Sequence, residues 1–325
     1  MTTGLDNIRS YLFRYSHLTG IESSAALTAA ELHALADEAH ANYQAARYQD
    51  VVARLPALLA AADFVRWSAG PGDRVQMYAA YASAYGVATK LLTKMGSGDL
   101  ALLAADRAAG AATETDSTQL RGAAAYHVAC ALLCSDRNEA AECLAVTMAE
   151  QVQRCARGDL PSLLSVAGAL WLIAAIVAAR RTDRAEALAR LDEAERLARL
   201  LGKDGNFAWM AFGTTNVAIH RVTVAAELGE PGEVVRAAEL VDPDCLPTGL
   251  DSRRAQVHLD VAWAQAQRRR DADAVLHLLE AEQVAPEALR YNVMVRELVR
   301  EMLVRQKRSR TNSLHRLAVR AGVLD

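Results

Sequence analysis

The chain has 325 residues, of which 52% are hydrophobic but only 5% aromatic, and its formal net charge is −3. Its apolar content is therefore mostly Ala, Leu and Val, residues that suit closely packed helices because Ala loses no side-chain entropy. No alternating β-branched run stands out, so we predict an all-α protein. The slightly acidic balance argues against affinity of the whole chain for nucleic acid, which would need a concentrated basic surface.

Cysteine usage and hydropathy indicate a cytoplasmic protein that does not associate with a membrane. The five cysteines are odd in number, which suits reduced thiols rather than disulfides. The amino terminus carries an early Asp6 and lacks the apolar run of a signal peptide. The longest apolar stretch, residues 163–179, is interrupted by Ser165 and Gly168, so we interpret it as a buried helix.

Helix-length segments follow one another along the chain from the amino terminus. Residues 1–27 predict an amphipathic lead-in helix, and Thr28 with Glu31 forms a capping box that opens the first hairpin. Breaks rich in Gly, Pro and Asp then separate further segments, which pair into hairpins. The predicted pairs are 29–46 with 48–64, 73–95 with 100–113, 117–134 with 138–155, 161–180 with 184–201, 215–228 with 232–241, and 252–269 with 272–285.

The last of these pairs carries the clearest repeat pattern. Asp271, Ala274, Leu278, Ala281 and Pro286 have the spacing of the second helix of a tetratricopeptide repeat. Comparable helix starts recur at steps of roughly 40 to 50 residues, slightly longer than the tetratricopeptide period of about 34. The region 28–286 is therefore predicted to form a tetratricopeptide-like right-handed superhelical solenoid of about six hairpins, in which each repeat packs on its neighbours.

The region 287–325 is predicted to end this array. Residues 287–306 keep an apolar stripe and indicate a capping helix, and residues 313–321 indicate a last short helix. The basic residues in and between these helices could contact phosphates, although charges near a chain end more often only solvate it. These residues are Arg305, Lys307, Arg308, Arg310, Arg316 and Arg320.

The densest polar and aromatic stretch runs from Asp204 to Val222. Asn216 and His220 stand four residues apart and therefore on one helical face. Because first helices line the concave groove of such an array, this face could bind a ligand, and an Asn amide both donates and accepts hydrogen bonds. Alternatively, Asn216 and His220 tie the preceding loop, residues 202–213, to the helix.

Aromatic residues on other first helices could extend that site, and core packing explains them about as well. The predicted ligand-binding residues are Asn216, His220, Thr223, Trp209, Tyr81, Tyr85 and Trp171. His127, Cys130 and Cys134 share one helical face but lack a fourth ligand, so burial in an Ala-rich core explains them better than a metal does. No catalytic motif is present, and we predict no catalytic residue, metal or cofactor.

Four motifs together resemble the tetratricopeptide sensor region of actinobacterial helix-turn-helix transcriptional regulators of the Xre type. The resemblance implies that the repeats receive a peptide or small-molecule signal and mediate dimerisation. Met1 lies almost directly before the repeats, which puts direct DNA binding by this chain in doubt. The motifs are ARYQDVVARLPALLAAA at 46–62, TKLLTKMGSGDLALLAADRA at 89–108, FGTTNVAIHRVTVAAELGE at 212–230 and LLEAEQVAPEALRYNVMVRELVREML at 278–303.

The sequence therefore predicts a non-enzymatic regulatory protein whose concave groove binds a peptide or small-molecule effector and which pairs with a protein partner or a second copy. The alternative is an interaction scaffold that presents the same groove to a protein partner without a small ligand. A third interpretation, a repressor that binds DNA through its basic tail, predicts salt-dependent affinity for duplex DNA.

Overall fold

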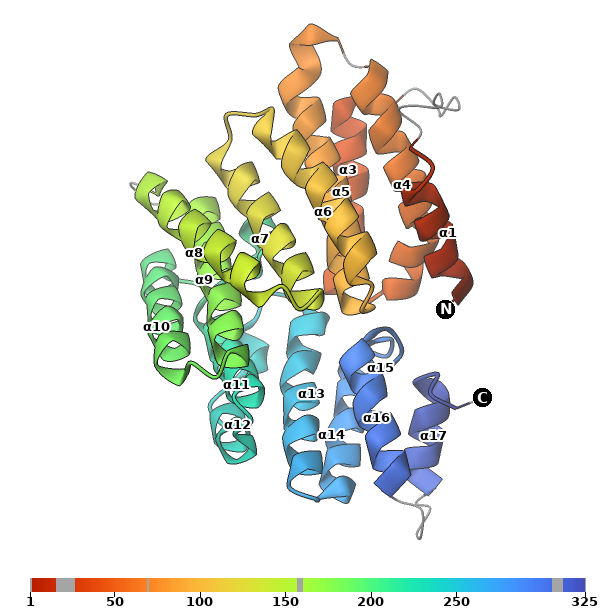
Figure 1. Ribbon diagram of the computed structural model, residues 1–325, viewed down its shortest axis with the longest axis vertical. Helices are drawn as coiled ribbons and strands as arrows, with labels where there is room; N and C mark the ends of the chain where they lie inside the picture. Colours follow the sequence, from red (N-terminus) through yellow and green to blue (C-terminus); the bar gives the residue numbers. More distant parts are fainter. Residues whose placement is uncertain (1, 16–26, 69, 157–159, 306–311, 325) are drawn as a thin grey trace.

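The computed structural model describes residues 2–15, 27–68, 70–156, 160–305 and 312–324 (Figure 1). Within these ranges the chain is mostly helical and has no strand, and one isolated bridge joins Gly205 to Phe212. The all-α prediction is confirmed. The capping box is also present: the Thr28 hydroxyl accepts from the Glu31 N–H at 3.2 Å, and the Glu31 carboxylate accepts from the Thr28 N–H at 2.8 Å.

Six helical hairpins make up the body of the described structure, each close to its predicted range. They are α3 (Ala29–Gln44) with α4 (Tyr48–Ser68), α5 (Arg74–Lys94) with α6 (Gly98–Thr113), α7 (Thr118–Cys134) with α8 (Asn138–Cys155), α9 (Pro161–Arg180) with α10 (Arg184–Leu201), α11 (Thr214–Glu227) with α12 (Pro231–Ala238), and α13 (Asp251–Gln267) with α14 (Asp271–Val284). The remaining described α-helices are α1 (Thr2–Leu12), α15 (Ala288–Tyr291), α16 (Val293–Arg305) and α17 (Asn312–Arg320).

The predicted capping helix over 287–306 is divided in two, because Asn292 interrupts it. Asn292 has an extended backbone between α15 and α16, and its side-chain oxygen accepts from the Met294 N–H at 3.0 Å. It therefore caps the start of α16, a role that Asn favours over a helix interior. Lys307, Arg308 and Arg310 of the basic tail lie outside the described residues.

All six hairpins turn with the same backbone geometry. In each turn one residue has a positive φ, and the N–H of the next residue donates to a carbonyl five positions back at 2.8–3.0 Å, which is the Schellman closure. The positive-φ residues are Ala46, Gly96, Asp136, Thr182, Gly229 and Arg269. The backbone thus repeats at positions where the side chains do not.

The first helices of the hairpins pack side by side in chain order, from α3 through α5, α7, α9 and α11 to α13. The array then closes, because α13 returns to contact α3. In Figure 1, α13 to α17 lie beneath the first three hairpins. The Glu287 carboxylate accepts from the Gln49 N–H at 2.7 Å, and the Tyr291 ring lies 5.8 Å from that of Tyr48.

This closure differs from the open groove that the repeat pattern suggested. The C-terminal segment does not simply end the stack: it packs on the turns of the first two hairpins, where Val293 lies against Gly96. At the amino terminus, α1 covers the other side of the first hairpin and buries Ile8 and Leu12.

The apolar helix α9 is the core of the fourth hairpin. Of the described helices it is the one with the length and apolarity to cross a membrane, and 83% of its apolar window is buried inside the protein. It packs against α7, α8, α10 and α11. This agrees with the prediction that residues 163–179 form a buried helix.

Candidate ligand site in the central cavity

The loop between the fourth and fifth hairpins, residues 202–213, enters the interior of the ring. Its Trp209 ring stacks on His40 of α3 with a centroid distance of 5.2 Å, and the indole N–H donates to Asp37 at 3.0 Å. Asn206 and Gln44 join their side-chain amides by two hydrogen bonds of 2.7 and 3.0 Å. The concave side is therefore occupied by the chain's own loop.

Phe212 anchors this loop. Its side chain is fully buried against α9, where a Cβ at Gly168 would lie 1.9 Å from the Phe212 ring. Asp204 fixes the other end of the loop by accepting from the backbone N–H of Thr215 at 3.1 Å and from its hydroxyl at 2.7 Å. Only a glycine at 168 leaves room for the ring.

The anchored loop holds a strained backbone. Ala208, Trp209 and Ala211 all have positive φ values, of 52°, 59° and 50°. Each such residue without the freedom of glycine costs on the order of 1 kcal/mol. Strain of this kind persists only where surrounding contacts fix it, and it is common at ligand sites.

A cavity of about 100 Å³ lies beside this loop at the centre of the ring. Hairpins one, two, three and six all contribute to its walls, so it exists only because the array closes. Its lining residues are Tyr43, Gln44, Lys90, Lys94, Tyr126, Trp209, Met210, Ala211, Ser252, Arg253 and Gln256.

Three of these residues, Lys90, Lys94 and Arg253, are cationic. Burial, and then the charge of Arg253, lowers the pKa of Lys90 to about 7 and that of Lys94 to about 8. Both lysines lie deep in the molecule yet keep part of their surface accessible, because they face the cavity.

The cations have neutral neighbours where counter-ions would be expected. The Lys90 ammonium contacts His40 Nδ1 at 3.1 Å and donates to the Trp209 carbonyl at 3.2 Å, while the Lys94 ammonium lies 5.5 Å above the Tyr48 ring. Among the described residues, the charged groups of Lys94 and Arg253 have no ion pair and no hydrogen bond, although both side chains line the cavity. An uncompensated charge inside a protein is costly.

Asp260 on α13, whose charge acts on Lys94, is a weak counter-ion. Burial raises its pKa to about 7, although the Thr223 hydroxyl and the Gln256 amide each donate to it at 2.7 Å. At neutral pH it is therefore only partly ionised. The cavity keeps an excess of positive charge, which an anionic group would balance.

The structure brings only one of the predicted ligand-binding residues, Trp209, to the cavity wall. Asn216 and His220 are buried on α11, where His220 Nδ1 lies 2.8 Å from its own helix carbonyl at Asn216. Burial, and then the charge of Arg253, lowers the pKa of His220 to about 3, so its ring is neutral. Thr223 donates to Asp260, and neither of these two residues lines the cavity.

The three other predicted residues lie elsewhere. Tyr81 and Tyr85 are almost fully buried within α5, where the Tyr85 hydroxyl donates to Asp63 at 2.9 Å. The Trp171 indole on α9 donates to Gln153 at 2.9 Å, away from the cavity. The seven predicted residues therefore do not form one site.

The alternative interpretation, in which Asn216 and His220 tie the loop to the helix, is not what the contacts show. Asp204 and Thr215 make that connection instead, and the Asn216 side-chain oxygen is buried without a hydrogen-bond partner. Sequence reasoning also missed Lys90, Lys94 and Arg253, the three cations of the cavity wall. Lys90 and Lys94 are four residues apart on a largely apolar helix, and this spacing could have indicated that they share a face. No local pattern indicated Arg253.

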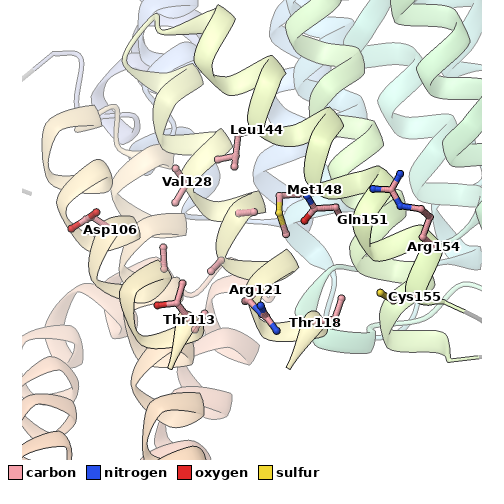
Figure 2. Close-up of a pocket in the computed structure, with 14 residues that line it drawn as sticks. Asp106, Thr113, Thr118, Arg121, Val128, Leu144, Met148, Gln151, Arg154 and Cys155 are labelled. Carbon is pink, nitrogen blue, oxygen red and sulfur yellow. The ribbon is translucent and has the colours of Figure 1, made fainter. Parts of the chain in front are cut away.

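An outer groove of about 590 Å³ offers a different chemistry (Figure 2). Its floor is α7 and its walls are α6 and α8, with Leu144 and Met148 among its apolar side chains and Arg121 and Arg154 at an exposed rim. Its charged groups lie in solvent and need no ligand to balance them. The central cavity is therefore the better candidate site.

Comparisons with known proteins assign no family to this fold or site. No protein-family model matches the chain, and no curated protein matches it either. The resemblance to the sensor region of Xre-type regulators thus stays a prediction from its motifs.

Proposed function

We propose that this chain is a non-enzymatic regulatory binding protein that senses a small anionic molecule in its central cavity. The convergence of Lys90, Lys94 and Arg253 without a matching carboxylate supports this proposal most directly. Tyr43 and Tyr126 line the same space, and a tyrosine hydroxyl can act as a neutral donor. The family resemblance, which implies signal reception by the repeats, agrees with it.

The size of the cavity limits the ligand. About 100 Å³ accommodates a phosphate, sulfate or carboxylate group with little else, whereas pockets for drug-sized ligands begin near 300 Å³. We therefore infer that a charged head group enters the cavity and that any larger part of the ligand remains outside. A long peptide lying along the first helices is less well supported, because the loop 202–213 fills that surface.

Ring closure provides a way to transmit the signal. Arg253 comes from the sixth hairpin and the two lysines from the second, so the three cations meet only when the array is closed. Their repulsion opposes closure, and an anion between them would favour it. A ligand with this preference shifts the population towards the closed ring.

Two earlier alternatives receive less support. An interaction scaffold would need an accessible concave groove, which the loop occupies. For the tail interpretation, Arg305 pairs with Asp271 at 3.0 Å and Arg320 with Glu282 at 2.6 Å, so these two charges are already compensated within the protein. Basic side chains that are already paired with carboxylates do not favour binding to a DNA backbone.

Isothermal titration of the full chain at pH 7 with inorganic phosphate, sulfate, succinate and a nucleoside monophosphate tests the proposal. We expect saturable binding of at least one class, and a loss of about tenfold or more in Arg253→Met or Lys94→Met, because each removes a charge in a poorly hydrated site. Lys203→Met, which removes an exposed charge from the same loop, is the matched control and should bind as the native protein does.

Binding should also depend on pH in a defined direction. An anion raises the pKa of both lysines, so binding near pH 8 takes up protons and affinity falls as the pH rises through about 7 to 8. Titration in two buffers of different ionisation enthalpy measures this uptake. Failure of every anion to bind, or undiminished binding by both variants, would overturn the proposed function.

A further inference from the structure

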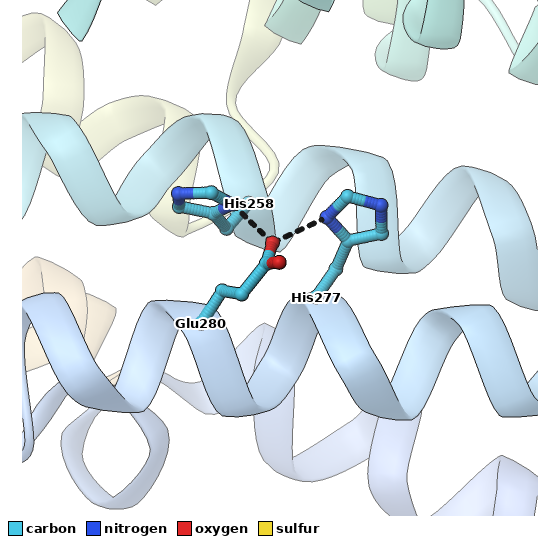
Figure 3. A group of neighbouring side chains, drawn as sticks. All are labelled: His258, His277 and Glu280. Carbon is cyan, nitrogen blue, oxygen red and sulfur yellow. Dashed lines mark ion pairs between the residues drawn. The ribbon is translucent and has the colours of Figure 1, made fainter.

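Two histidines and a glutamate meet on the sixth hairpin, away from the central cavity. Figure 3 shows the Glu280 carboxylate of α14 between the rings of His258 on α13 and His277 on α14. One carboxylate oxygen lies 3.1 Å from the Nδ1 atom of each histidine. All three potential ligand atoms lie within 4.8 Å of one another.

The helices fix this arrangement. His277 and Glu280 are three residues apart and share one face of α14, and His258 faces them from the antiparallel partner within the same hairpin. The two helices pack along their length, so the ligand atoms come from a preformed scaffold rather than from a mobile loop.

The cluster is incomplete without a further atom. His277 Nδ1 is buried and has no hydrogen-bond partner, even though the Glu280 oxygen is only 3.1 Å away, because the angle does not suit a hydrogen bond. Buried polar atoms normally have a partner. A cation placed between the three atoms would satisfy this nitrogen through its lone pair.

The spacing fits a small transition-metal ion. Zinc binds His nitrogen at about 2.0–2.1 Å and carboxylate oxygen at about 2.0–2.2 Å, which in a tetrahedron separates neighbouring ligand atoms by roughly 3.3 Å. The two observed nitrogen–oxygen separations of 3.1 Å lie close to that value. Imidazole nitrogen also favours zinc over calcium or magnesium, which prefer shells of oxygen.

We propose that His258, His277 and Glu280 form a zinc site that joins α13 to α14, a site absent from the sequence-based prediction of no metal. Three protein ligands leave a fourth position, and Glu280 is 51% exposed, so that position opens towards solvent. Water or a group from another molecule can occupy it. The site does not depend on the proposed anion-binding function.

Titration calorimetry with Zn²⁺ on the purified full chain tests this assignment. Because thiolates also bind zinc, the exposed Cys143, Cys155 and Cys245 are first replaced by serine. We expect one zinc ion per chain and a rise in melting temperature on zinc addition, since the metal links two helices of the folded state. Mg²⁺ should produce neither effect.

Variants separate the cluster from adventitious binding. His258→Gln and Glu280→Gln should each lower zinc affinity by about tenfold or more and abolish the thermal shift. His33→Gln is the matched control, because His33 lies 3.7 Å from Asp37 in an exposed pair with only two ligand groups. Circular dichroism checks that each variant folds, and Glu280→Gln alters only a half-exposed side chain.

The outcomes are distinct. Loss of binding in the His258 and Glu280 variants, with the His33 variant unchanged, supports the site. Native-like zinc affinity in both cluster variants, or no zinc binding by the cysteine-replaced chain, overturns it and leaves the three residues as an ion-pair cluster. Neither result bears on anion binding, which the cavity variants test separately.

Discussion

The six hairpin turns repeat one backbone geometry, whereas the interior of the ring does not repeat. The turns share one backbone geometry while their residues vary from Gly96 to Thr182 and Arg269. The interior, in contrast, holds features that do not repeat from hairpin to hairpin: the irregular loop 202–213 and the cluster of Lys90, Lys94 and Arg253. In this molecule the repeated hairpins form the ring, and the irregular loop 202–213 forms part of the candidate site.

This difference is also one of stability. The turns satisfy their own carbonyls locally, so each hairpin can form with its neighbours. The interior combines positive-φ residues with unneutralised charge, both of which oppose folding, and depends on anchors such as Phe212. Proteins tolerate such features mainly where binding requires them.

The largest expected effect is on the loop anchor. Phe212→Ala should lower the free energy of unfolding by about 3–5 kcal/mol, because it removes a fully buried ring and leaves a cavity against Gly168. Urea denaturation measures this. Released from its anchor, the loop should also become more sensitive to trypsin at Lys203.

Phe13→Ala provides the control, because Phe13 is 53% exposed and should change stability by no more than about 0.5 kcal/mol. Equal effects of the two substitutions would show that the interior is not anchored in the way described.

A smaller effect is expected from the cation cluster, in the opposite direction. Lys94→Met should raise the free energy of unfolding at pH 7 by about 2 kcal/mol in the absence of an anion, because folding lowers the pKa of this amine from 10.5 to about 8. The unfolded chain holds the proton of Lys94 more tightly than the folded protein does. The destabilisation that the charged amine causes is therefore complete below about pH 8 and disappears above about pH 10.5.

Denaturation of the variant and the native protein at pH 7 and pH 10 checks this sign, and other titrating groups cancel in the comparison. The stabilisation should shrink at pH 10. A destabilised variant at pH 7 would mean that Lys94 contributes packing or hydrogen bonds that outweigh its charge.

The smallest effect is expected in the turns. Thr182 is a β-branched residue at φ 60°, so Thr182→Gly should stabilise the protein by about 0.5–1 kcal/mol. The matched reverse change, Gly229→Ala at φ 73°, should destabilise it by a similar amount. Thermal or urea denaturation measures both, and effects of the same sign would contradict the shared geometry of the turns.

Much of the fold could be predicted because its determinants are local. Helix starts such as Thr28 with Glu31, breakers such as Gly229 with Pro231, and small residues at helical spacing act within a few positions of one another. The hairpin ranges therefore followed from the sequence, with errors at places such as Asn292, where a side chain caps the following helix instead of continuing the preceding one.

The candidate site was harder to predict because its parts are distant. Trp209 was predicted because it lies in a dense polar and aromatic stretch. No sequence pattern predicted that Arg253 lies near Lys90, because more than half of the array separates them in sequence. Asn216 and His220 had the right spacing for a binding face, but α11 turns that face into the protein. Similarly, the spacing of His277 and Glu280 is visible in the sequence, while the approach of His258 is not.

The sequence by itself determined the all-α class, the six hairpins and their order, since helix periodicity and turn chemistry depend on neighbouring residues. Tertiary structure alone decided that the array closes into a ring, that the loop 202–213 fills its centre, and that three cations from two distant hairpins face one cavity. The physical reason is that the curvature of the array is the sum of small rotations between successive hairpins. Side-chain packing across the whole molecule sets those rotations.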